Sequence, residues 1–549
     1  MPLRTPESRP EVSRRSFLES SLTLGAASAL APLLAPGAEA VAAQSDVRPF
    51  ELDEITVGAL QDGLNSGQFT SRSLAQKYLD RIEQIDKHGP ALNSVIEVNP
   101  DALSLAVAMD AERKTKGPRG PLHGIPVLIK DNIGTADRMM TTAGSLALEG
   151  FTPSKDSGVA RRLRNAGAVI IGKTNLSEWA NFRSSHSSSG WSGRGGQTHN
   201  PYAVDRNPCG SSSGSGVAAS ANLCVAAVGT ETDGSVVCPS SINGLVGIKP
   251  TVGLVSRAGI VPIAHSQDTA GPMCRNVTDA AILLGALAGF DPDDAATGAS
   301  RGKAESDYTK YLDRGGLKGA RIGVLRKLFN FSEKIPPLME AALDAMKREG
   351  AILIDPIEMD TLDQFRESEF EVLQYEFKAD MAAYLGQFPN APVHSLKDII
   401  DFNNQNRSKE MPYFGQDLME KSEAKGPLTE KAYQDALVKN HRLMREEGID
   451  AVMNTNSLDA IVAPTAGPAW MTDLVVGDHG TGGSSSPAAV AGYPDITVPC
   501  GFVFGLPVGI SFFGRAWSEG TLLRIAYAFE QATKVRKPPR LLATADIRV

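Results

Sequence analysis

The sequence predicts an α/β fold in which one large domain is built around a central β-sheet. Short apolar runs bounded by Gly or Asp, typical of buried strands, alternate along the chain with segments of helical periodicity. No internal repeat and no clear Pro/Gly/Ser-rich linker divides the 549 residues. We therefore expect a single domain over residues 50–545, although a chain of this length also accommodates several average domains.

The first half of the chain supplies a helix and then a series of buried strands. Residues 71–86 carry Leu74, Tyr78 and Ile82 at helical spacing behind a serine cap. A short basic helical segment precedes the second of the strands, and a polar glycine loop follows the third. The predicted strands lie within residues 124–131, 166–175 and 222–234.

The second half predicts a strand–helix–strand unit at residues 319–357 and further strands within 458–465, 494–502 and 505–514. Residues 290–455 are richer in charge and in helix-forming residues than the rest. We expect this segment to form a helical layer over the sheet, and residues 71–285 and 455–530 to form the core.

Composition and charge exclude several classes of function. The hydrophobic content of 42% and the charged content of 21% are those of an ordinary soluble globular protein. The formal net charge of −8, without a sustained basic run, argues against a nucleic-acid or anionic-membrane partner. The eight histidines form no H-E-x-x-H and no H-x₃-H pair, and no Walker lysine or dinucleotide fingerprint is present. We therefore expect no metal and no cofactor.

The N-terminus has the pattern of a twin-arginine export signal. Arg14 and Arg15 precede a moderately apolar run at residues 22–37, and small residues follow at 38–45. The apolar run contains Gly, Ser and Pro and is shorter than the roughly 20 residues of a spanning helix. We expect residues 1–43 to be removed, with cleavage near Ala40 to Ala43. The mature protein is then periplasmic or extracellular, with no stable membrane anchor and only a transient contact with the export machinery.

The five cysteines are too few and too scattered to predict a disulfide framework, and no C-x-x-C pair suggests zinc. We expect each cysteine to be a small buried apolar residue.

The stretch C-G-S-S-S-G-S-G at residues 209–216 fits the G-x-S-x-G nucleophile elbow, with Ser212 at the centre. An elbow needs a strand before its serine. Pro201 and Pro208 argue against a central strand here, although His265 or His441 is available as a base. The match is therefore expected to be fortuitous.

Lys130 and Ser235 offer a different chemistry. Lys130 ends an apolar strand, where an ammonium group is costly unless it is paired or deprotonated, and desolvation can turn a lysine into a general base. Ser235 lies in a glycine-containing loop just after a buried strand, where α/β sheets place their sites. The N–H groups of residues 232–235 can then form an oxyanion hole. The alternatives are a lysine that extends into solvent and a plain strand–helix turn.

Taken together, six segments resemble the amidase signature family, and most closely its peptide amidase branch. The resemblance is strong over residues 120–275 and weak over 290–450. It implies a mixed, twisted central sheet covered by helices on both faces. The resembling segments are 121–133, 190–202, 207–220, 228–263, 266–273 and 491–514.

The resemblance also implies a Ser–cis-Ser–Lys triad. Lys130 matches the family's lysine, Ser211 the bridging serine preceded by a cis peptide from Gly210, and Ser235 the nucleophile. Thr232, Asp233 and Gly234, together with Ser235 itself, then supply the oxyanion-binding N–H groups. Gly210, Ser212 and Trp191 are expected to support the site, with the substrate pocket lined by residues near Trp191 and by the 290–455 segment.

Two departures from the family pattern are present: Cys209 replaces a glycine, and Asp233 stands where glycine is commoner. We interpret Asp233 as a mark of the peptide amidase branch. The resemblance predicts hydrolysis of a carboxamide, either a peptide C-terminal amide or a small aliphatic or aryl amide. The alternatives are an amidase subunit of a tRNA-dependent amidotransferase and an inactive binding protein on the same fold. The oligomeric state stays open.

Overall fold

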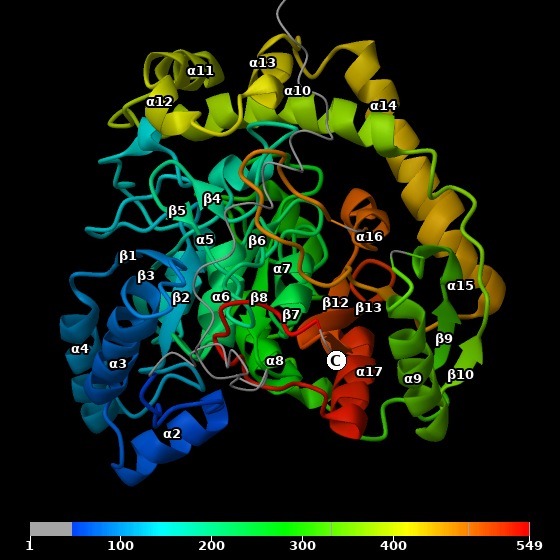
Figure 1. Cartoon of the computed structure of the whole chain (residues 1–549), viewed down its shortest axis with the longest axis horizontal. Coiled ribbons are helices and arrows are strands. Elements are labelled where there is room, and N and C mark those ends of the chain that lie inside the picture. The colour runs from blue at the N-terminus through cyan, green and yellow to red at the C-terminus, as the bar shows by residue number, and fades with distance from the viewer. Residues whose placement is uncertain (1–46, 331, 481, 548–549) are drawn as a thin grey trace, which may run out of the picture. The chain divides into compact units, whose positions relative to one another are not determined.

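The computed structural model describes residues 47–330, 332–480 and 482–547, and its centre is a mixed sheet of eleven strands (Figure 1). The strand order is β1-β3-β2-β6-β8-β7-β12-β13-β11-β9-β10. Strand β2 pairs in parallel with β3 and β6, and β9 pairs in parallel with β10 and β11; the other neighbours are antiparallel. The expected mixed α/β sheet is confirmed.

The strands are β1 Val95–Val98, β2 Pro126–Lys130, β3 Val169–Thr174, β4 Trp191–Ser192, β5 Gly196–Gln197, β6 Ala226–Glu231, β7 Val246–Lys249, β8 Thr269–Cys274, β9 Arg321–Val324, β10 Ile352–Ile354, β11 Ala460–Pro464, β12 Asp495–Val503 and β13 Leu506–Phe513. The α-helices of the first half are α2 Val57–Ser66, α3 Ser71–Arg81, α4 Ala102–Lys116, α5 Gly158–Asn165, α6 Ser213–Ser220, α7 Val237–Ile242 and α8 Val277–Leu287. Those of the second half are α9 Ile335–Arg348, α10 Arg366–Leu385, α11 Leu396–Gln405, α12 Arg407–Glu410, α13 Asp417–Glu423, α14 Lys431–His441, α15 Asp450–Asn456, α16 Ser486–Ala491 and α17 Glu519–Thr533.

Each strand that the sequence predicts is present, and the helix expected at residues 71–86 runs as α3 followed by a π-helical turn at Ile82–Lys87. The cap of α3 differs from the expectation. Thr70, one residue before the expected serine, accepts a hydrogen bond from the Ser73 N–H, and the Ser73 hydroxyl bonds back to Thr70. This reciprocal capping box satisfies N–H groups that the first helical turn leaves unpaired.

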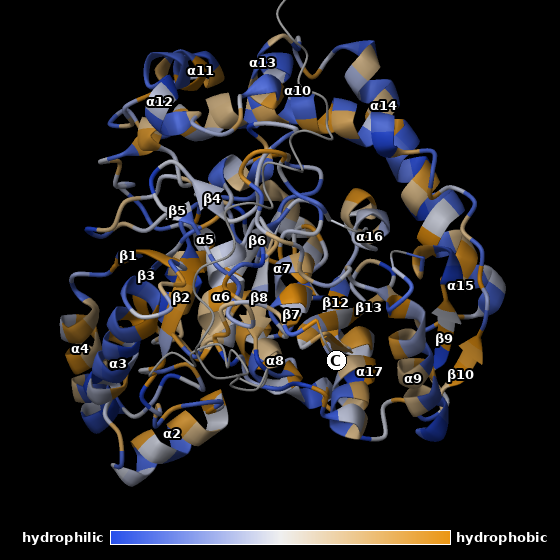
Figure 2. Ribbon diagram, viewed as in Figure 1, coloured by the Kyte–Doolittle hydropathy of each residue, from blue (hydrophilic) through white to orange (hydrophobic). Residues whose placement is uncertain are grey.

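The strands that carry the site are buried along their whole length, which is the pattern of a sheet covered on both faces. Helix α6 packs on β2, β3 and β6, while α8 and α17 pack on each other and on β8 and β12. In Figure 2, β2 is orange, whereas the loops between the sheet and α10 are mostly pale. The main apolar core therefore lies around the sheet, and the polar loops lie beyond its strand ends.

Residues 290–455 are not simply a helical layer on a face of the sheet, as the sequence suggested. This segment includes β9 and β10, which extend the sheet at one edge. Its helices α10, α11 and α13 contribute to a second apolar cluster that contains no strand residue and packs on loop residues such as Trp179, Phe182 and Ile263. Figure 1 shows α10–α14 along the top of the view, beyond the strands. These helices therefore cover the loops that follow the strands.

Residues Gln44–Val549 form one compact unit. The predicted export signal, residues 1–43, lies outside the described residues. Among the described residues, no helix combines the length and the apolar character that a membrane span requires.

Candidate active site

Lys130 is the last residue of β2, and its side chain is completely buried rather than extended into solvent. Its Nζ lies 2.8 Å from Ser211 Oγ, 2.8 Å from Thr230 Oγ1 and 3.3 Å from the Thr230 carbonyl oxygen. Thr230 is on β6, the strand beside β2, so strand pairing brings these groups together. The three acceptors match the three N–H bonds of an ammonium group, and loss of one proton leaves a lone pair for Ser211.

Burial lowers the pKa of Lys130 to about 7, against the opposing influence of the nearby charges of Asp268 and Glu231. A desolvated ammonium group loses its proton more readily than one in water. A substantial fraction of Lys130 is therefore neutral at neutral pH, as a general base must be.

Ser211 lies in the loop before α6, and the peptide bond from Gly210 to Ser211 is cis, as the resemblance implies. Its carbonyl oxygen accepts a hydrogen bond from the Ser177 N–H at 3.0 Å. The neighbouring Ser212 is not available as a nucleophile. Its hydroxyl donates to the Thr230 carbonyl oxygen at 3.0 Å and accepts from the Thr230 N–H at 3.1 Å. The G-x-S-x-G match thus has a structural role, which joins α6 to β6.

Ser235 lies in the loop between β6 and α7 and is 8% exposed. Glu231, at the end of β6, accepts hydrogen bonds from the N–H groups of Val236 and Val237 at 2.7 and 2.9 Å. These bonds hold the backbone directly after Ser235. The Ser235 carbonyl oxygen accepts from the Ser212 N–H at 3.2 Å, so the loops of the two predicted catalytic serines are in contact.

The N–H groups of Asp233, Gly234 and Ser235 have no hydrogen-bond acceptor within the described part of the chain. Gly234 has a φ of +80°, and a Cβ there would lie 2.9 Å from Ser485 Oγ, so this turn requires glycine. Thr232 is held by its hydroxyl, which donates to Asp268 at 2.6 Å. Unpaired N–H groups beside a serine are what an oxyanion hole needs.

Asp233, the departure from the family pattern, accepts hydrogen bonds from the hydroxyls of Ser485 and Ser486 at 2.5 and 2.6 Å. Glu369 of α10 lies beside it. Burial and the charge of Asp233 raise the pKa of Glu369 well above its ordinary value. The two acids therefore carry less than two negative charges at neutral pH.

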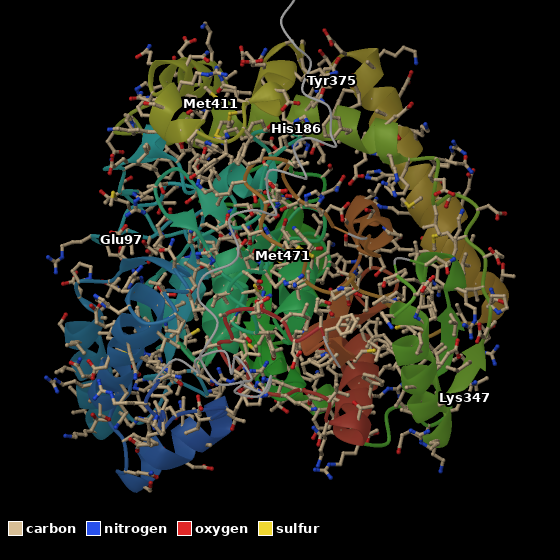
Figure 3. All side chains as sticks on the ribbon, viewed as in Figure 1. Glu97, His186, Lys347, Tyr375, Met411 and Met471 are labelled. Carbon is tan, nitrogen blue, oxygen red and sulfur yellow. A yellow bond between two sulfur atoms is a disulfide. The ribbon has the colours of Figure 1, made fainter. Side chains whose placement is uncertain are left out.

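A cavity of about 440 Å³ opens at Ser235. Its described lining contains three acidic residues and no Lys or Arg, and apolar side chains from α10 and α13 form part of its wall. Figure 3 labels His186, in the loop that contributes three serines to the lining, and Tyr375 on α10. The lining is Ala180, Asn181, Phe182, Ser184, Ser185, Ser187, Gly210, Thr232, Asp233, Ser235, Ile263, Glu369, Phe370, Leu373, Leu418 and Asp478.

Part of the predicted pocket lining is correct, because the 290–455 segment contributes Glu369, Phe370, Leu373 and Leu418 to it. Trp191 itself does not line this cavity. Its indole packs edge-on against Tyr413 and Phe414 and lies beside the buried guanidinium of Arg183. Trp191 therefore supports the wall from behind.

The expectation for the cysteines is wrong at two positions. Cys209 and Cys238 form a disulfide, with their Cα atoms 6.2 Å apart, whereas Cys224, Cys274 and Cys500 are free and buried. The two paired residues are 29 positions apart in the sequence but adjacent in the fold, because α7 lies against the loop before α6. Sequence spacing alone does not carry this information.

The histidines considered as alternative bases do not touch Ser235 within the described structure. The ring of His265 is held by Asp380 at 3.0 Å and by Glu376 at 3.3 Å. Burial lowers the pKa of His441, at the end of α14, to about 4. These two rings therefore have other surroundings, and Lys130 is the base that the geometry brings to the serine pair.

Sequence reasoning missed four polar residues that hold the site: Asn132, Thr230, Glu231 and Asp268. Asn132 donates to Thr230 Oγ1 at 3.0 Å. Asp268 accepts from the N–H groups of Ile263 and Ala264 as well as from Thr232, and burial raises its pKa to about 6. A polar residue at the end of each buried strand was the available signal, but only the strand order shows which strand ends meet.

Comparison with known proteins gives a consistent result. The family model described as Amidase matches residues 73–523. A probable amidase of Arabidopsis thaliana is 44% identical over 503 residues, 90% of this chain and 93% of the relative. The native peptide amidase of Stenotrophomonas maltophilia is 52% identical with a TM-score of 0.86, covering 89% of this chain and 99% of that one. One subunit of the glutamyl-tRNA(Gln) amidotransferase of Thermotoga maritima is 27% identical with a TM-score of 0.67, covering 91% and 98%.

The fold, the sequence motifs and these matches agree over almost the whole described chain. This protein belongs to the amidase signature family and is an amide-hydrolysing enzyme of that family.

Proposed function

We propose that the enzyme hydrolyses carboxamides with Ser235 as nucleophile, Ser211 as proton relay and Lys130 as general base. The observation that carries this proposal is the 2.8 Å contact between Lys130 Nζ and Ser211 Oγ in a fully buried setting, with the pKa of Lys130 near 7. Ser235 Oγ attacks the amide carbonyl carbon while its proton passes to Ser211, and the proton of Ser211 passes to Lys130.

The tetrahedral intermediate places a negative charge on the former carbonyl oxygen. The unpaired N–H groups of residues 233–235 are the donors that stabilise it. Lys130, now an ammonium, returns its proton through Ser211 to the leaving nitrogen, and ammonia or an amine departs. Water then attacks the acyl-enzyme by the same relay, and the carboxylate product and free Ser235 are regenerated.

The proposed substrates are peptide C-terminal amides, or small aliphatic or aryl amides. The cavity at Ser235 supports uncharged amides with an apolar group, because Phe182, Phe370 and Leu373 line it beside Asp233. A negatively charged acyl group meets three acidic residues there and no compensating Lys or Arg in the described lining. The 52% identity to a peptide amidase supports the peptide amides among these classes.

The amidotransferase alternative has weaker support. The amidotransferase matches are less similar than the peptide amidase match, and the acidic net charge does not favour a tRNA partner. We propose that the enzyme works without a cofactor and without nucleic acid.

We also propose export by the twin-arginine pathway, with function in the periplasm or outside the cell. The disulfide Cys209–Cys238 supports this location, because disulfides persist in oxidising compartments and are rare in the cytosol.

The decisive experiment compares wild type and Ser235→Ala on a panel of peptide amides, aliphatic amides and anilides, with ammonia or amine release measured. Wild type is expected to turn over at least one class, and Ser235→Ala to lose roughly 10⁴-fold or more in kcat. The variant should also lose labelling by a fluorophosphonate while keeping its far-UV circular dichroism. A folded Ser235→Ala variant with near-normal turnover would refute the assignment.

A further inference from the structure

The disulfide joins the two loops that carry Ser211 and Ser235. Cys209 lies two residues before Ser211, and Cys238 lies three residues after Ser235, in the first turn of α7. The Cys238 N–H donates to the Gly234 carbonyl oxygen at 2.8 Å, so Cys238 is tied to the turn that presents Ser235. One covalent link therefore fixes the approach of the relay serine and the nucleophile to each other.

The other direct links between these loops are hydrogen bonds. The Ser212 N–H donates to the Ser235 carbonyl oxygen at 3.2 Å, and Asn243 Nδ2, at the end of α7, donates to the Pro208 carbonyl oxygen at 2.9 Å. Single hydrogen bonds of this kind allow displacements of a few tenths of an ångström at little cost. The transfer of a proton between two hydroxyls is sensitive to displacements of that size.

We propose that Cys209 and Cys238 are positioning residues for catalysis, and that opening their disulfide lowers turnover of a folded enzyme. This inference rests on the proposed roles of Ser211 and Ser235. The reaction is an exchange with a dithiol: the S–S bond takes up two electrons and two protons to give two thiols, and the dithiol is oxidised to its cyclic disulfide. Cys238 is only partly buried, whereas Cys224, Cys274 and Cys500 are buried, so the reagent has access to one sulfur of this pair.

The first measurement is a thiol count on the exported protein, unfolded without reductant. Three thiols are expected, and five after reduction, because only Cys209 and Cys238 pair among the five cysteines. Five thiols in the unreduced protein would overturn the proposal.

The second measurement is steady-state kinetics before and after treatment with dithiothreitol, at a temperature well below unfolding. Reduction is expected to lower kcat by about 10- to 100-fold with KM changed less than about threefold, since the relay is misplaced while the cavity keeps its walls. Reoxidation with glutathione disulfide should restore kcat, which separates the effect from unfolding. A kcat that is unchanged on reduction would refute the positioning role.

Two variants complete the test. Cys209→Ser/Cys238→Ser should have the low kcat of the reduced enzyme and no response to dithiothreitol. Cys500→Ala, a free buried cysteine away from these loops, should respond as wild type does. If the double variant does not fold, the reversible response of wild type still decides the question. Failure of the proposed function itself is recognised separately, by an active Ser235→Ala variant.

Discussion

Lys130 is the residue on which the proposed chemistry depends, and its surroundings explain why. A buried ammonium without a carboxylate in contact is costly, so the folded state favours the neutral amine. Thr230 then accepts N–H bonds from the amine, which leaves the lone pair directed to Ser211. The same burial that destabilises the charged lysine therefore makes it a base.

The pH dependence follows from this pKa. Because the pKa of Lys130 is lowered to about 7, the base is protonated and inactive below that value and neutral above it. We expect kcat/KM for an uncharged amide to rise about tenfold per pH unit below roughly pH 7 and to level above it. The rate of fluorophosphonate labelling should follow the same curve. A profile that is flat from pH 5 to 8 would contradict a lysine base.

The two relay residues should differ in the effect of their removal. Lys130→Ala removes the base and should lower kcat nearly as much as Ser235→Ala, with partial recovery at high pH. Ser211→Ala should cost less, because a water molecule can take the place of its hydroxyl. Parallel kcat measurements on both variants, with circular dichroism as the folding control, check this order. A mild effect of Lys130→Ala would favour a histidine base.

Asp233 should discriminate against the product acid. Its carboxylate lines the cavity next to Ser235, so it repels the carboxylate that hydrolysis creates. Asp233→Asn keeps an oxygen acceptor at this position but removes the charge. We expect the peptide acid to inhibit wild type weakly, and its inhibition constant to fall about tenfold in the variant, with the KM of the matching amide little changed. Equal inhibition constants in the two proteins would remove Asp233 from this role.

At the scale of elements, the connection from β6 to α7 holds the nucleophile through a carboxylate rather than through a side chain of its own loop. Glu231 accepts the N–H groups of Val236 and Val237, and so it fixes the backbone that follows Ser235. A negative charge at the N-terminus of a helix is also favoured by the helix dipole. In addition, the charge of Glu231 raises the pKa of Lys130.

Glu231→Gln should therefore change two observables at once. We expect kcat to fall about tenfold, because one of the two backbone bonds weakens, and the midpoint of the pH profile to move to lower pH, because Lys130 loses an opposite charge. Glu530→Gln is the matched control, since Glu530 is a buried carboxylate that accepts the N–H of Val277 at the start of α8, away from the site. A loss of activity without a shifted midpoint would indicate a structural role alone.

The elements also show what the sequence can and cannot predict. The strands 126–130, 169–174 and 226–231 are apolar runs with sharp ends, so their existence and bounds follow from local pattern. The strand order is set by long-range packing, and it alone brings Lys130 to Thr230 and Ser211. For the same reason the pairing of Cys209 with Cys238 and the capping carboxylate of Glu231 were not predicted, although Lys130, Ser211 and Ser235 were identified by resemblance.

At the scale of the whole molecule, the helices α10–α14 build the substrate side of the cavity while the sheet builds the catalytic side. The catalytic segments match the family pattern closely over residues 120–275, whereas the covering helices match it weakly. This division lets the acyl group that is accepted vary while the hydrolytic chemistry stays the same. It is also why the sequence predicts the reaction class better than it predicts the substrate.

The last prediction concerns where the molecule works. Residues 1–43 carry Arg14 and Arg15 in the export pattern, and the catalytic loops are joined by a disulfide that an oxidising compartment preserves. We expect wild type to be found outside the cytoplasm with its signal removed near Ala40 to Ala43, measured by cell fractionation and the mass of the mature chain. A variant with both arginines changed to lysine should stay in the cytoplasm at full length, because the export machinery requires the arginine pair. Because the cytosol keeps thiols reduced, that retained protein should also show five thiols where the exported one shows three. Export of the lysine variant at the wild-type level would exclude the twin-arginine route, whatever its thiol count.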